Sequence, residues 1–134
     1  MPALVLDTEA VNALAHPRSR GATSLRAFAI GRLAQRHSAR PIIPLPVLAE
    51  VYRGDRTDVE VDRLIDTAAD VVGITLRTVR LAGSLRARTG KGSAVDALVV
   101  ASAVRLGGAV IATADPDDLR ALAADHPNVK VWPL

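Results

Sequence analysis

The 134-residue sequence contains no cysteine, which excludes disulfide scaffolds, thiolate metal sites and cysteine nucleophiles. Aromatic residues make up only 2% of the chain, namely Phe28, Tyr52 and Trp132, so a platform for stacking single-stranded bases is not expected. No uninterrupted apolar run reaches the roughly 18 residues of a membrane span, and the N-terminus lacks the pattern of a secretory signal. We therefore expect a cytoplasmic protein with no membrane partner.

The remaining composition is that of an ordinary globular domain. Hydrophobic residues make up 49% of the chain and charged residues 23%, which excludes collagenous, coiled-coil and disordered chains. The length suffices to bury one core but not two. Residues 1–134 are therefore expected to form a single domain.

Charged residues are segregated along the chain, although the net charge is only +3. No acid occurs in residues 10–49 or in residues 71–95. The cations of these two segments are Arg18, Arg20, Arg26, Arg32, Arg36 and Arg40, then Arg77, Arg80, Arg86, Arg88 and Lys91. Solvated helix faces that meet acids after folding explain this pattern, as does a surface that binds phosphates beside an acidic centre. Arginine outnumbers lysine fifteen to two, which bidentate phosphate contacts favour, although codon bias in a GC-rich genome has the same effect.

Short apolar runs alternate with helical periodicity along the whole chain. The expected strands are residues 3–6, 41–45, 71–76, 110–113 and 129–132. The expected helices begin at Thr8 and cover residues 24–37, 47–53, 58–69, 78–88, 95–106 and 116–124. In the second helix, the expected apolar face comprises Leu25, Phe28, Ala29 and Leu33. Strands too apolar to face water predict a three-layer α/β fold, with an approximately five-stranded, mostly parallel sheet covered by helices on both sides.

Four acids occupy positions that suggest a shared site. Asp7 ends the first strand and Asp115 follows the fourth, and ligands of open parallel sheets bind beyond such strand ends, where the strand order reverses. Asp96 lies in the first turn of the most apolar helix, and Glu50 has apolar neighbours on both sides. Isolated carboxylates rarely occupy such surroundings without a partner.

Local structure offers an alternative explanation for each acid taken alone. The alternatives are an N-cap at Asp7 or Thr8, a surface pair between Glu50 and Arg53, a capping box between Ser93 and Asp96, and an N-cap at Asp115 followed by Pro116 and Asp118. Four such coincidences at one end of a sheet are less probable than a common site.

Four carboxylates in one pocket would repel each other unless a cation lay between them. Mg²⁺ or Mn²⁺ prefers oxygen ligands and keeps water that can serve as a nucleophile, which is the chemistry of phosphodiester hydrolysis. His16, His37 and His126 are too scattered for a histidine zinc site.

Four segments carry a resemblance to a known family: residues 5–8 (VLDT), 46–51 (PVLAEV), 94–101 (AVDALVVA) and 111–119 (IATADPDDL). In this order and at these intervals they resemble the PIN-domain ribonucleases, most closely the VapC-type toxins of toxin-antitoxin pairs. The resemblance implies a PIN-like fold and an RNA-cleaving toxin. Such a toxin would act on tRNA or ribosomal RNA with Mg²⁺ or Mn²⁺ and thereby inhibit translation and growth. It also implies a homodimer and silencing by a small VapB-like antitoxin.

The same resemblance assigns roles to individual residues. The implied catalytic and metal-binding acids are Asp7, Glu50, Asp96 and Asp115, with Asp118 as a further ligand and with Thr8 and Thr113 in support. The acid-free segments, rather than the resemblance, supply the candidate contacts to the RNA backbone, which are Arg18, Arg20, Arg86, Arg88 and Lys91. The apolar surfaces of residues 47–52 and 25–33 are the expected seat of the antitoxin.

Glu9 departs from the family pattern, because many relatives have a serine there; its charge would lie near the metal. Residues 90–92 (GKG) superficially resemble a phosphate loop, but the spacing is wrong and no strand precedes them. Two alternative functions are a receiver-like signalling module, which accounts for acids at strand ends but not for Glu50 and Asp96, and a non-catalytic relative that binds RNA or protein.

Overall fold

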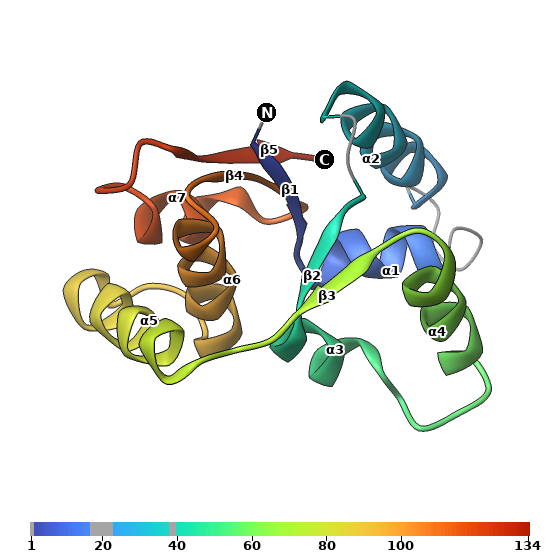
Figure 1. Ribbon diagram of the computed structural model, residues 1–134, viewed down its shortest axis with the longest axis horizontal. Coiled ribbons are helices and arrows are strands. Elements are labelled where there is room, and N and C mark those ends of the chain that lie inside the picture. The colour runs from blue at the N-terminus through green and yellow to red at the C-terminus, as the bar shows by residue number, and fades with distance from the viewer. Residues whose placement is uncertain (1, 17–22, 38–39) are drawn as a thin grey trace.

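The computed structural model describes residues 2–16, 23–37 and 40–134, in which helices and strands alternate as expected (Figure 1). The strands are β1 (Ala3–Leu6), β2 (Ile42–Pro44), β3 (Asp70–Val72), β4 (Ala109–Thr113) and β5 (Val129–Pro133). The helices are α1 (Thr8–Ala15), α2 (Thr23–His37), α3 (Leu45–Val51), α4 (Asp58–Thr67), α5 (Leu76–Thr89), α6 (Ala94–Arg105) and α7 (Pro116–Leu122).

All five strands join one parallel sheet in the order β3-β2-β1-β4-β5. The order reverses between β1 and β4, which pair with Leu6 opposite Ala112. This pairing confirms that the ends of the first and fourth strands meet at the switch point. The order also differs from the 2-1-3-4-5 order of receiver-like folds, so the fold excludes that alternative.

Helices cover the two faces of the sheet, which gives the predicted three layers. In Figure 1, α5, α6 and α7 lie together in the left half of the view, below β4 and β5, and α1, α2 and α4 lie in the right half, on the other side of β1. Among the described residues, no helix has the length and apolar character needed to cross a bilayer.

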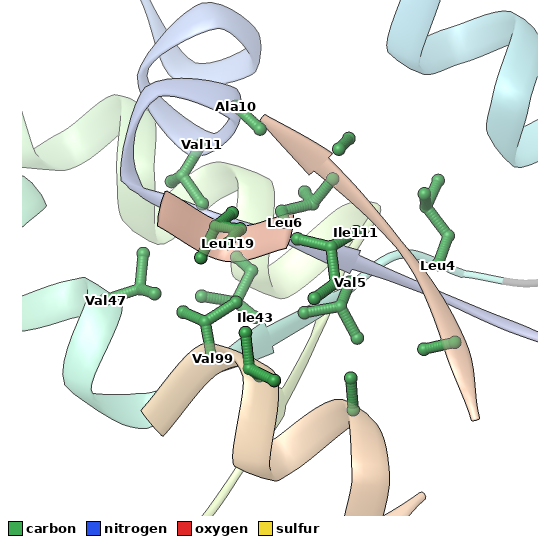
Figure 2. Close-up of a cluster of buried hydrophobic side chains, with 14 of the residues drawn as sticks. Leu4, Val5, Leu6, Ala10, Val11, Ile43, Val47, Val99, Ile111 and Leu119 are labelled. Carbon is green, nitrogen blue, oxygen red and sulfur yellow. The ribbon is translucent and has the colours of Figure 1, made fainter. Parts of the chain in front are cut away.

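The core lies between the sheet and these helices. Leu4, Val5 and Leu6 of β1 are fully buried, and Figure 2 shows their side chains among Val11, Val99 and other apolar residues. The central strand β1 is therefore apolar throughout and leads directly into Asp7.

The expectation that every strand is too apolar to face water is wrong for the two edge strands. Asp70 and Val71 of β3 are exposed, as are Lys130 and Trp132 of β5. An edge strand has only one neighbour in the sheet, and a short, charged edge disfavours pairing with another chain.

Several element boundaries also differ from the prediction, and two of the differences have a clear local cause. The third helix begins at Leu45 rather than Val47, because a proline such as Pro46 is tolerated in the first turn, where its missing N–H is not needed. The strand expected over residues 71–76 ends at Val72, and α5 begins at Leu76 because the Thr75 side chain caps it by accepting a hydrogen bond from the Thr78 backbone N.

The apolar face that was predicted for α2 coincides only in part with the face that is buried in the structure. Ile30 and Leu33 are buried, whereas Leu25 is 76% exposed and Phe28 65% exposed. The arginine side chains help to shield this surface, since the Arg32 guanidinium lies 5.9 Å from the centroid of the Phe28 ring.

Candidate active site

Asp7 lies directly after β1, at the carboxyl edge of the switch point. Its backbone N donates to Ala112 O at 3.4 Å, and its Oδ1 accepts from the Ala10 backbone N at 3.0 Å. The side chain thus caps α1, as the local alternative proposed, and it is also held beside the end of β4. Capping and membership of a site are therefore compatible here.

The pKa of Asp7 is raised to about 6, chiefly by burial and to a smaller extent by the charges of Asp96 and Glu9. Hydrogen bonds from the Thr113 hydroxyl and the Ala10 backbone act in the opposite direction, because both favour the ionised form. Asp7 and Asp96 therefore lie close enough to interact electrostatically, although they are 89 positions apart in the chain. Glu9 adds negative charge to the same group, as its departure from the family pattern predicted.

Asp96 is oriented by the predicted capping box at the start of α6. The Ser93 backbone N donates to Asp96 Oδ2 at 3.0 Å, and the Asp96 backbone N donates to Ser93 Oγ at 3.1 Å. Gly92 packs against the same carboxylate: a side chain there would place its Cβ 3.5 Å from Asp96 Oδ2 and 2.8 Å from Leu122 Cδ1. Asp96 thus takes part in the cap of α6, and the same contacts hold its carboxylate near Asp7.

Glu50 lies on α3 and is held from α1, because Thr8 Oγ1 donates to Glu50 Oε1 at 2.6 Å. The alternative pair with Arg53 is not found in the part of the chain that the structure describes. The expected cost of burying the Glu50 charge is also absent: the residue is exposed, while Val47, Leu48 and Val51 carry the buried face of α3. Thr8 is the residue next to Asp7, and its hydrogen bond therefore links the Glu50 carboxylate to the start of α1.

Asp115 and Asp118 lie at the start of α7, which follows β4. Asp115 occupies the N-cap position, but its side chain makes no capping hydrogen bond; instead its backbone N donates to Thr113 Oγ1 at 3.0 Å. Thr113 is fully buried and so serves both Asp7 and Asp115. Asp118 is half-buried on the first turn of α7.

Within residues 2–16, 23–37 and 40–134, no group of three or more acidic or histidine side chains is close enough to hold a metal ion. The expectation of four carboxylates gathered in one pocket is therefore not met. Mg²⁺, however, is usually bound through one or two carboxylates together with water and substrate phosphates. The Asp7–Asp96 pair fits that requirement, because a cation would compensate the charge of a carboxylate whose pKa is raised by burial and, to a smaller extent, by repulsion from Asp96.

The candidate RNA-binding cations divide into three groups. Arg18 and Arg20 lie outside the described residues. Arg88 is tied to the fold, since its Nη1 lies 2.9 Å from Asp125 Oδ2 and its Nη2 donates to Leu122 O at 3.2 Å. Arg86 and Lys91 line an open hollow next to α6. Residues 90–92 follow a helix rather than a strand, as the sequence indicated, and a nucleotide phosphate loop requires a preceding strand.

The fold and site together define a three-layer α/β domain with carboxylates at the switch point of a parallel sheet. Comparison with known families identifies this class further: the model of the PIN domain family matches residues 4–125. The chain therefore belongs to the PIN domain family, as the four sequence segments indicated. No curated protein sequence matches the chain.

Solved structures share the fold over nearly the whole length. VapBC2 from Rickettsia felis, bound to a DNA fragment from the promoter, has a TM-score of 0.71 and 14% identity, with 98% of each chain covered. FitAcB from Neisseria gonorrhoeae has a TM-score of 0.60 and 17% identity over 96% of each chain. FitAB bound to the IR36 DNA fragment has a TM-score of 0.63 and 14% identity over 97% of this chain and 94% of that one.

Proposed function

We propose that this protein is a metal-dependent endoribonuclease and the toxin of a toxin-antitoxin pair. The observation that carries the proposal is the Asp7–Asp96 pair at the switch point, in which the pKa of Asp7 is raised by burial and by the neighbouring negative charges. Carboxylates whose pKa is shifted by burial and by neighbouring charges are typical of functional sites. Membership of the PIN domain family supports the nuclease activity.

Asp7 and Asp96 would hold Mg²⁺ or Mn²⁺, with Asp115, Asp118 and Glu50 as further acids of the site. When bound, such an ion activates water and stabilises negative charge on a phosphoryl oxygen. The chain itself fixes the acids. Ala10 N and Thr113 orient Asp7, the Ser93 capping box orients Asp96, and Thr8 orients Glu50.

Removal of single charges tests the activity. Asp7→Asn and Asp96→Asn should each abolish Mg²⁺-dependent cleavage of tRNA or ribosomal RNA and the growth arrest on expression, because each removes a carboxylate of the pair. Circular dichroism should show an unchanged fold, since asparagine also caps helices well. A purified Asp7→Asn variant that still cleaves RNA in Mg²⁺ would overturn the assignment.

A metal titration distinguishes the nuclease from a non-catalytic relative. If the protein is a metal-dependent nuclease, Mn²⁺ should bind the unsubstituted protein, and this binding should be lost when either Asp7 or Asp96 is neutralised. Failure of the intact protein to bind Mn²⁺, together with RNA binding without cleavage, would favour the non-catalytic relative.

We propose two protein partners, which are a small VapB-like antitoxin and a second copy of the chain. The similar structures VapBC2 and FitAB are complexes by name, and this supports an antitoxin partner. The exposed side chains Leu25 and Phe28 on α2 offer an apolar contact for it, in a segment of the chain that contains arginines but no acid. A translation-inhibiting ribonuclease would act in the cytoplasm. Co-purification with the product of a neighbouring short reading frame, followed by light scattering, tests both partners.

A further inference from the structure

An open groove runs along the side of α5 that faces α6. One part is a hollow of about 370 Å³, lined by Gly83, Arg86, Ala87, Gly90, Lys91 and Gly92. A smaller hollow of about 150 Å³ shares Gly83 and Arg86 and is otherwise lined by Val79, Ala82, Ala94 and Leu98. Since a water molecule takes about 30 Å³, the larger part has room for more than a single small ion. The groove is thus cationic at one end and apolar at the other.

The cations of the groove have no counterions in the described part of the chain. The Arg86 and Lys91 side chains make no ion pair or hydrogen bond to any described residue, in contrast to Arg88, which is held by Asp125. None of the lining residues in this part of the chain is acidic. Two unpaired cations on one concave surface favour an anionic ligand.

The cationic end of the groove adjoins the acids of the candidate active site. Gly92 lines the hollow and packs directly against Asp96, whose Oδ2 would be 3.5 Å from a Cβ at that position. The groove and the Asp7–Asp96 pair therefore adjoin each other at Gly92.

Gly83 supplies an independent observation. It lies in the middle of α5, where glycine destabilises a helix relative to alanine. No described atom lies within 4 Å of the position that its Cβ would take, so packing within the chain does not explain the missing side chain. Gly83 lines both hollows, and the missing side chain keeps the groove open.

We propose that this groove holds the strand of the RNA substrate next to the cleaved bond, with Arg86 and Lys91 on a neighbouring phosphate and the ribose and base toward Val79 and Leu98. The inference rests on the proposed function and names the path of its substrate. RNA fits better than an acidic protein segment because every nucleotide of a strand engaged at Asp96 carries a phosphate, so the next phosphate must lie near the adjoining surface.

The charge contribution is tested by RNA binding as a function of salt. Fluorescein-labelled single-stranded RNA of mixed sequence is titrated with the Asp7→Asn protein in EDTA, so that no RNA is cleaved. Combined Arg86→Gln and Lys91→Gln substitutions should weaken binding about tenfold per cation. They should also lower the slope of log K against log salt by about 0.7, the contribution of one neutralised phosphate on a single strand.

Arg77→Gln is the matched charge control. Arg77 is exposed in the first turn of the same helix, nine residues from Arg86, and does not line the groove. Its substitution should leave both the affinity and the salt slope unchanged.

The shape contribution is tested at Gly83. Gly83→Gln should fill the groove and weaken RNA binding at least fivefold while the melting temperature stays equal or rises, since glutamine is a better helix former. Ser84→Gln adds the same side chain one residue further along, outside both linings, and should leave RNA affinity unchanged. A more stable but weaker-binding Gly83→Gln variant cannot be explained by misfolding.

The outcomes separate this proposal from the function on which it rests. If the intact protein cleaves RNA but the Arg86, Lys91 and Gly83 variants keep its affinity and salt slope, the groove assignment is wrong and the nuclease assignment stands. If the intact protein neither binds nor cleaves RNA, both are wrong. If the variants lose only the binding of an acidic protein partner, the groove is a protein interface and the RNA path is overturned.

Discussion

The carboxyl group of Asp7 is buried beside two other acids, yet it also caps α1. Its raised pKa means that the folded protein holds a proton that the unfolded chain has already released. Stability attributable to this group is therefore greatest below the unfolded pKa, near pH 4, and declines as the pH rises to about 6. Above that, the ionised carboxylate opposes folding by about 3 kcal/mol, at 1.36 kcal/mol per pKa unit.

Asp7→Asn is accordingly expected to stabilise the metal-free protein. Urea unfolding in EDTA should show a gain of about 2–3 kcal/mol at pH 8 that shrinks toward zero near pH 4, because asparagine keeps the cap but carries no charge. A gain that does not change with pH, or a loss of stability at pH 8, would contradict the assigned cause of the pKa shift.

Thr8 acts through Glu50 as a positioning residue. Thr8→Val removes the 2.6 Å hydrogen bond to Glu50 Oε1 and should lower kcat for RNA cleavage about tenfold, with little change in KM. Thr8→Ser keeps the hydroxyl and should restore kcat. If valine and serine are equally active, Thr8 has no positioning role.

At the scale of elements, the start of α6 fixes one of the acids. The Ser93 capping box holds the Asp96 carboxylate on one side, and Gly92 with a φ of 75° packs against it on the other. A residue with a side chain is strained at such a φ and would also collide with Leu122. The backbone before the helix therefore determines where Asp96 points.

Gly92→Ala should destabilise the protein by about 2–4 kcal/mol, from the unfavourable φ together with overpacking against Leu122, and should reduce RNA cleavage by displacing Asp96. The matched control is Gly107→Ala, at the other end of α6. Gly107 has a φ of 85° with no atom within 4 Å of a Cβ, so only about 1–2 kcal/mol should be lost, with cleavage unchanged. Urea unfolding and cleavage assays on the two variants measure the difference. Equal stability losses would show that contact with Leu122 is unimportant.

Local signals made most of the elements predictable. Asp7 after an apolar run, Ser93 three residues before Asp96, and Asp115 before Pro116 are read from neighbouring residues, and the structure places each near a helix start as expected. A proline is tolerated in the first turn of a helix, so Pro46 is compatible with α3. The sequence does not show, however, whether the helix begins before or after this proline.

Long-range contacts account for what was not predictable. The bond between Thr8 and Glu50 joins residues 42 positions apart, and the exposure of Phe28 depends on which side of α2 meets β1 and α1. Helical periodicity identifies an apolar stripe but cannot distinguish a face that meets the core from one that awaits a partner.

At the scale of the whole molecule, α2 combines exposed apolar side chains with a lack of acids. Leu25 and Phe28 lie in a segment whose only charges are positive, so a partner with apolar and acidic side chains would complement this helix. The core does not depend on these two side chains.

Phe28→Ser should therefore lower affinity for the antitoxin at least tenfold, because a large aromatic contact is lost. The free energy of unfolding of the toxin alone should change by less than about 0.5 kcal/mol, since Phe28 is 65% exposed. Calorimetric titration with the purified antitoxin measures the first effect, and urea unfolding measures the second. Undiminished affinity would place the antitoxin on another surface.

The pairing of β1 with β4 also governs when the protein becomes active during its own synthesis. Ala3 lies opposite Ala109, so more than a hundred further residues must be made before the β4 neighbour of the first strand leaves the ribosome. Asp7 consequently lacks Asp96 and Thr113 while most of the chain is being made. At about 5–20 residues per second, this interval lasts several seconds or more. A nascent chain therefore lacks the complete acidic site, and under the proposed function it would be unable to cleave RNA beside the ribosome that is making it.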